Sequence, residues 1–139
     1  MADCCGTNKP QAQNAPCCGG DKKTVLIYAC SGGANVAEIS DKAARELMFG
    51  GCGTMFCLAG LGAGIQGMIQ TAKDADVNLV VDGCPMECAK KVFEKAGITD
   101  FAYMKVTDLG IEKVKGVRGT DEQVQKVVAK AKEVLAAQK

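Results

Sequence analysis

The amino-acid sequence predicts an α/β fold, with a four-stranded, mainly parallel sheet covered by helices on both faces in the three-layer manner of Rossmann-like and flavodoxin-like domains. Segments rich in β-forming residues alternate four times with segments of helical periodicity. Residues 77–82 (VNLVVD) form a continuous apolar run of the kind found in strands covered on both faces. The 139 residues can bury one core but are too few for two ordinary domains, so we expect residues 24–139 to form a single domain.

The first half of this region predicts two strands and two helices. We expect a strand at residues 24–29 (TVLIYA) and a helix from Asn35, because Asn35 and Glu38 have the spacing of a capping box. A glycine-rich break at residues 50–53 then precedes a short strand, TMF. The apolar stripe of the helix that follows comprises Leu61, Ile65, Met68, Ile69 and Ala72.

The second half predicts two further strands, each followed by a helix. After residues 77–82, Pro85 suits the first position of a helix, and Gly97 suits its end. Residues 101–106 (FAYMKV) predict the fourth strand, and Thr120 with Gln123 predicts the cap of the last helix.

Composition excludes several classes of function. The net charge is +1, and four Phe, two Tyr and no Trp provide no stacking platform, so we expect no nucleic-acid partner. The first residues lack the apolar core of a signal peptide, and the most apolar stretch (FCLAGLGAGIQGMI) is too short to span a bilayer. We therefore expect a cytoplasmic protein with no membrane partner.

The chain contains nine cysteines and no histidine. In the reducing cytosol this favours metal ligands or reactive thiols over a disulfide framework, and it rules out histidine-assisted nucleophiles. Residues 1–23 carry two Cys-Cys pairs in a polar context, which predicts a flexible, cysteine-rich arm. Whether these pairs bind a second soft metal ion or are spare thiols stays open.

Four cysteines follow the ends of the first three predicted strands: Cys30, Cys57, Cys84 and Cys88. Ligands of parallel sheets bind beyond the carboxyl ends of the strands. If the three strands are neighbours, the four sulfurs could converge, and the spacing of four would place Cys84 and Cys88 on one helical face. A tetrahedral four-thiolate site for a metal ion is one interpretation.

Three successive motifs carry a family resemblance: CSGGANVAEISDKAARELM, CLAGLGAGI and VVDGCPMECAKKVFEKAG. Together they resemble the DGC-domain family, which is described as zinc-binding and is named for the Asp-Gly-Cys found here at residues 82–84. The resemblance covers roughly residues 24–108 and implies one Zn²⁺ held by Cys30, Cys57, Cys84 and Cys88. A closed shell of four thiolates has no open position for a water molecule. We therefore expect a small protein that handles metal or thiols without being an enzyme, whose protein partner is unknown.

Other interpretations remain. Cys84 could be the nucleophile of a sulfur-transfer or redox enzyme, with Cys88 or Cys57 as the resolving thiol, and four thiolates could also hold an iron–sulfur cluster. Gly62, Gly64 and Gly67 match a dinucleotide fingerprint, but the preceding strand is very short and the residues CLAGL separate it from the glycines. This favours close helix packing, with Asp82 accepting backbone amides. We expect the basic stretch KVKGVRG to be a solvated face.

Overall fold

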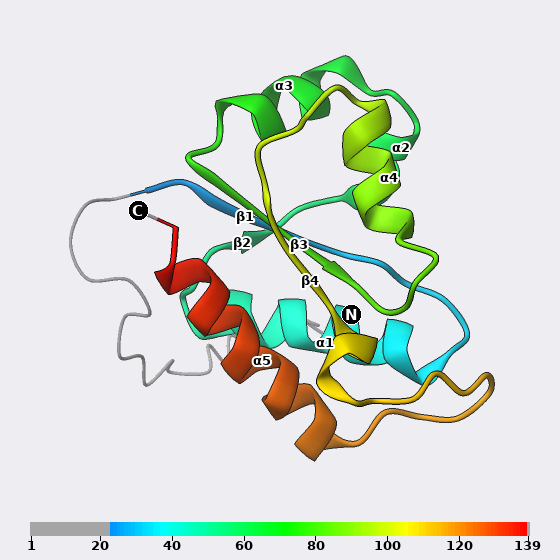
Figure 1. Cartoon of the computed structure of the whole chain (residues 1–139). Coiled ribbons are helices and arrows are strands. Elements are labelled where there is room, and N and C mark those ends of the chain that lie inside the picture. Colours follow the sequence, from blue (N-terminus) through cyan, green and yellow to red (C-terminus); the bar gives the residue numbers. More distant parts are fainter. Residues whose placement is uncertain (1–22, 139) are drawn as a thin grey trace, which may run out of the picture.

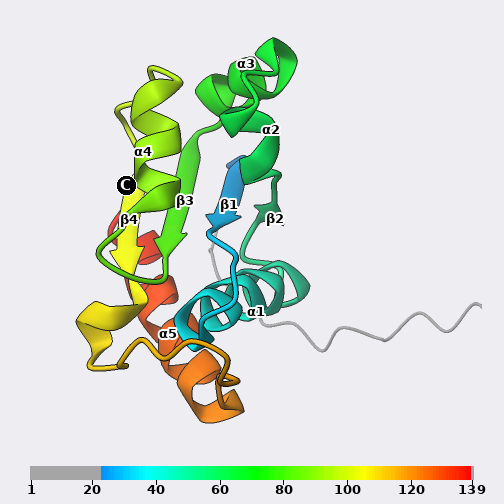
Figure 2. The ribbon, with the colours of Figure 1, turned by 90° about the vertical axis from the view of Figure 1, so that its right-hand side faces the viewer.

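A computed structural model describes residues 23–138, so the predicted arm lies almost entirely outside the described residues. Within that range the strands form one parallel sheet in the order β2-β1-β3-β4, and Figure 2 shows them side by side. This confirms the predicted four-stranded sheet. The strands are β1 (Val25–Ala29), β2 (Thr54–Met55), β3 (Val77–Asp82) and β4 (Ala102–Lys105).

Helices cover both faces of the sheet, which confirms the three-layer arrangement (Figure 1). Helices α1 and α5 pack on one face and α2, α3 and α4 on the other. The helical segments are α1 (Asn35–Phe49), α2 (Leu58–Gly62), α3 (Gln66–Asp74), α4 (Cys88–Lys95), the 3₁₀ turn η1 (Val106–Leu109) and α5 (Asp121–Ala136).

The two cores follow from the alternation of side chains along the strands. In β1, Ile27 points to the layer of α1 and α5, whereas Leu26 and Tyr28 point to the layer of α2 to α4. In β3, five of the six residues are buried, as the apolar run predicted. The central strands β1 and β3 are therefore the rigid base from which the segments at their carboxyl ends project.

The predicted second helix is divided in two. Helix α2 ends at Gly62, and Gly64 has a φ of 74°, a left-handed conformation that glycine adopts without strain. Ile65 then becomes the N-cap of α3 and is 51% exposed, so it does not belong to a continuous apolar stripe. The G-x-G-x-x-G match thus falls on a break between two helices and not on a strand-to-helix turn.

The two predicted capping boxes have different outcomes. The box of α5 is confirmed, since the Thr120 hydroxyl accepts from the Gln123 amide and the Gln123 side chain accepts from the Thr120 amide. The box of α1 is wrong, because Ala34 is the N-cap and no side chain caps it. Asn35 and Glu38 instead accept backbone N–H groups from the segment between β4 and α5.

No helix among residues 23–138 is both long enough and apolar enough to cross a membrane.

The segment before α5 allows a test of its packing against α1. A Cβ added at Gly119 would collide with the side chain of Ile39, which is fully buried, whereas one added at Gly67 in α3 would meet no atom within 4 Å. We expect Gly119→Ala to lower the free energy of unfolding by about 1–3 kcal/mol through overpacking. The control, Gly67→Ala, should leave the free energy of unfolding unchanged. Equal denaturation midpoints for the two variants would contradict this close packing.

Candidate functional site

Three of the four expected cysteines line one cavity at the carboxyl edge of the sheet. Cys30 follows β1 directly, Cys84 lies two residues beyond β3, and Cys88 is the first residue of α4. They line a cavity of about 270 Å³ together with the glycine-rich loop after Cys30 and the start of α1. Three of the four predicted residues therefore line the same cavity.

The fourth expected cysteine, Cys57, does not line this cavity. It is exposed and is the N-cap of α2, which belongs to the opposite layer from α1. Because β1 separates β2 from β3, the ends of these two strands lie about 10 Å apart, two strand spacings. Cys57 thus stands beside the end of β1, on its far side from Cys84.

Cys30, Cys57, Cys84 and Cys88 are free thiols, and they are not arranged as a complete set of metal ligands. Within residues 23–138, no three cysteine, aspartate or glutamate side chains are placed so that they could hold a metal ion. Cys30, Cys84 and Cys88 consequently share a cavity without sharing a common coordination point.

Cys30 is the most embedded of the three cavity thiols. Its sulfur accepts the backbone N–H of Gly83 at 3.1 Å and lies 3.5 Å from the hydroxyl of the buried Ser40. Burial raises the pKa of this thiol, and the contacts with Ser40 and Gly83 oppose that rise in part. Gly83 can approach because it has no side chain: a Cβ there would lie 3.0 Å from the backbone of Val36.

The turn between Cys84 and Cys88 differs from the prediction. Pro85 is not the first helical residue, since α4 begins only at Cys88, and Cys84 and Cys88 therefore do not share a helical face. The reason is Asp82, whose buried carboxylate accepts the N–H groups of Ala89 and Lys90 at 2.9 and 3.0 Å. This contact sets the start of α4 and confirms that Asp82 accepts backbone amides.

Glu87 closes this turn in a strained conformation. Its φ of 54° is the only positive φ of a non-glycine residue within residues 23–138, and the left-handed region costs such a residue roughly 1–2 kcal/mol. Its carboxylate pairs with Lys105 of β4 at 3.2 Å and with Lys90 at 3.4 Å. The pKa of Glu87 lies below its ordinary value, and the main cause is the hydrogen bond from Lys105.

Sequence reasoning missed Lys113. Its Nζ donates to the sulfur of Cys84 at 3.3 Å, and Lys113 and Lys115 both line the cavity. The basic stretch is exposed at residues 113–118, as expected, but it also contributes to this cavity. Asn35 holds this segment: its side chain donates to the carbonyl of Glu112 and accepts the N–H of Val114. The signal that could have found Lys113 is charge, because clustered thiolates need a neighbouring cation.

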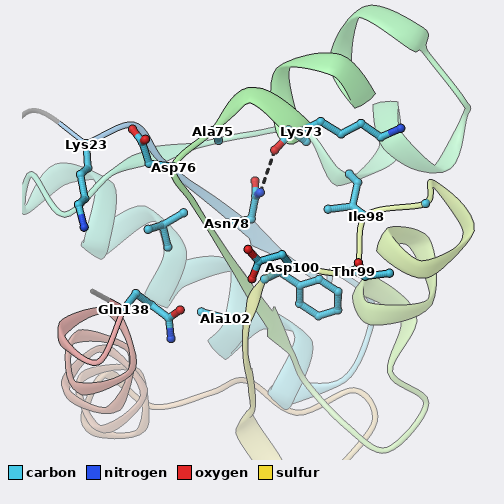
Figure 3. A pocket seen from close by; sticks show the side chains of 14 residues that line it. Lys23, Lys73, Ala75, Asp76, Asn78, Ile98, Thr99, Asp100, Ala102 and Gln138 are labelled. Carbon is cyan, nitrogen blue, oxygen red and sulfur yellow. Dashed lines mark hydrogen bonds between the residues drawn. The ribbon is translucent and has the colours of Figure 1, made fainter.

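A larger cavity of about 390 Å³ lies at the opposite edge of the sheet and contains no thiol (Figure 3). Charged side chains at its rim include Lys23, Lys73, Asp76 and Asp100. Asn78 lies among them and donates to the carbonyl of Ala72 at 2.8 Å. The amide oxygen of Asn78 is buried and accepts no hydrogen bond from the residues that the structure describes.

The ion pairs of Glu87 predict a dependence of stability on pH. Because the folded state lowers the pKa of Glu87, the charged carboxylate stabilises the fold above its ordinary pKa of 4.5, and this contribution is lost as the pH falls through the lowered value. Glu87→Gln should therefore reduce the free energy of unfolding at neutral pH, and the difference from the unmodified chain should shrink in acid.

Urea denaturation over a range of pH measures this difference. Glu94→Gln on the same helix is the control, since Glu94 forms no ion pair with the described residues. A Glu87→Gln difference that stays constant down to the most acidic pH would contradict the role given to the carboxylate.

Comparison with known proteins now adds a family to this geometry. The family model for the DGC domain matches residues 26–131. The chain is similar to the Anaerobic and virulence modulator AnvM of Pseudomonas aeruginosa, with 30% identity over 88 residues that make up 63% of this chain and 67% of AnvM. No solved structure matches the chain. Since the family model spans well over half of its length, the chain belongs to the DGC domain family.

Proposed function

We propose that this chain binds one Zn²⁺ through cysteine thiolates at the carboxyl edge of the sheet. Cys30, Cys84 and Cys88 provide the cavity side of the site, and Cys57 supplies a fourth thiolate from the end of β2. The observation that carries the proposal is the gathering of three thiols from two strand ends and a helix start in one cavity. The chain has no histidine, so thiolates are its strongest ligands for zinc.

The surroundings of the cavity suit thiolate ligands. Zinc binding requires each cysteine to lose its proton. The N–H of Gly83 already donates to Cys30, and the ammonium group of Lys113 already donates to Cys84. Cys57 and Cys88 are exposed, and exposed side chains change rotamer on the nanosecond timescale, so these two thiols can reorient toward a metal ion.

Binding or transfer of a metal ion fits this site better than metal-ion catalysis. A zinc ion held by four thiolates has no position left for a water molecule, so it does not activate water. AnvM is named as a modulator, which supports a regulatory role for this relative of it. We place the protein in the cytoplasm, where thiols of this kind stay reduced.

Substitution of the cavity cysteines tests the proposal. Cys30→Ser, Cys84→Ser and Cys88→Ser should each weaken zinc binding at least roughly tenfold, because thiolate ligands dominate the affinity of such a site. Ser31→Ala is the control, since Ser31 lines the same cavity without a thiol. Zinc content by elemental analysis and competition with a coloured chelator give the measurement. Equal zinc content in all four variants would sink the assignment.

The contact between Lys113 and Cys84 favours a second candidate, thiol–disulfide exchange. The Cys84 thiolate would attack one sulfur of a disulfide substrate, form a mixed disulfide and release the other sulfur as a thiol. Cys88 would then attack Cys84 and release the second thiol. The substrate is reduced by two electrons, and the chain ends with a Cys84–Cys88 disulfide.

Thiol titration separates the two candidates. With a disulfide reagent, the zinc protein should show roughly four more reactive thiols after chelation than before it. Full reactivity before chelation, with rapid release of both halves of the reagent, would favour the exchange reaction. Strong visible absorption of protein purified without oxygen would indicate an iron–sulfur cluster in place of zinc.

A further inference from the structure

The connection between η1 and α5 forms an exposed edge beside the thiol cavity. Residues 112–118 are all exposed, and Figure 2 shows this connection passing beyond the carboxyl ends of the strands. Lys113 and Lys115 line the cavity together with Met86, whose side chain is 59% exposed. Exposed connections at this edge of a parallel sheet are common places for recognition.

The backbone of Val114 is paired with the start of α1. Its carbonyl accepts the N–H of Asn35 at 3.0 Å, and its N–H donates to the Asn35 side chain at 2.7 Å. The next hydrogen bond runs from the N–H of Gly116 to the carbonyl of Gly33 at 3.0 Å. One edge of this segment is therefore fully used by contacts within the chain, and these contacts fix its position.

The backbone of Lys115 faces the other way. Lys115 pairs with Ala34 in an antiparallel bridge, and the two hydrogen bonds lie on either side of this pair, so the N–H and C=O of Lys115 point away from α1. Neither group forms a hydrogen bond with any residue between 23 and 138. An unpaired edge of this kind is a template for an added strand.

We propose that this edge binds an extended acidic segment of a protein partner, which adds to it as an antiparallel strand. The N–H and C=O of Lys115 pair with the backbone of the partner, and the Lys115 side chain pairs with a carboxylate. Lys115 forms no ion pair with the part of the chain that the structure describes. The inference stands apart from the proposed zinc site, since no metal ion takes part in it.

The alternation of side chains specifies the pattern of the partner. Lys113 and Lys115 lie on the cavity side, and Val114, which is 41% exposed, lies between them on the opposite side. Residues directly opposite each other in two strands share a face. The partner therefore carries acidic residues at every second position, opposite the lysines, and apolar residues between them.

Charge disfavours two other occupants of this edge. A second copy of the chain would bring Lys115 of both copies close together, and like charges opposite each other are destabilising. Residues 1–22 contain two aspartates and two lysines, so they provide no net negative charge. Nucleic acid provides phosphates but no backbone N–H and C=O groups for strand pairing.

Amide hydrogen exchange of the unmodified full-length chain tests the edge. Relative to an unstructured chain, the amide of Val114 should be protected and that of Lys115 should not. The probe is an eight-residue peptide of alternating glutamate and valine with blocked ends. At saturation it should slow exchange at Lys115 at least about fivefold more than at Val114. Protection of Lys115 before the probe is added, or equal effects at both amides, would overturn the proposal.

Modified probes test strand pairing without altering the protein. Fluorescence anisotropy measures the dissociation constant of each labelled peptide. Methylation of the glutamate nitrogens, which face Lys115 in an antiparallel pair, should weaken binding at least about tenfold, whereas methylation of the valine nitrogens should not. A peptide of the same composition with four glutamates before four valines should also bind more weakly. Equal affinities of these peptides would contradict strand addition.

Charge reversal at Lys115 tests the acidic partner. Lys115→Glu should weaken binding of the alternating glutamate–valine peptide at least about tenfold, because it places like charges opposite each other. Lys91→Glu on the exposed face of α4 is the control and should retain the affinity. Equal binding by the two variants, or by a lysine–valine peptide, would overturn the proposal. Zinc content of the same variants reports separately on the proposed function.

Discussion

The buried carboxylate of Asp82 is the interaction on which the candidate site depends. It accepts hydrogen bonds from the N–H groups of Ala89 and Lys90 in the first turn of α4 and from the hydroxyl of Tyr103 on β4, so it joins three elements at one point. A buried carboxylate without such donors would be costly. The start of α4 is therefore fixed by Asp82, and the residues between Gly83 and Glu87 have to form a turn. That turn places Cys84 and Cys88 at the same cavity.

A second set of contacts brings positive charge to the thiols. The segment between β4 and α5 crosses the start of α1, where the Asn35 side chain and the backbone of Gly33 hold it. Lys113 thereby reaches Cys84, although 29 residues separate them. The same sheet edge thus combines soft sulfur donors, an amide donor from Gly83 and a cation. This combination suits thiolate chemistry in a partly desolvated place.

Hydrophobic periodicity predicted the order of strands and helices, and the parallel-sheet rule predicted the edge at which the cysteines lie. Both succeeded because they depend on neighbours in the sequence or on a general property of the fold. The predictions for Asn35 and Pro85 failed. Asn35 bonds with residues near position 113, and Asp82 delays the helix that Pro85 was expected to start. Residues far away in the sequence compete with local helix caps for these hydrogen bonds, and a local sequence pattern does not indicate such partners.

The sequence by itself determined a three-layer α/β domain with four cysteines beyond its strand ends, because alternation of apolar residues dictates which segments become strands and helices. Only the tertiary structure decided that Cys30, Cys84 and Cys88 share a cavity while Cys57 stands outside it. The physical reason is the strand order: β1 lies between β2 and β3, so the ends of β2 and β3 are kept two strand spacings apart. Strand order and the path of Lys113 depend on packing between distant segments, which composition and periodicity do not specify.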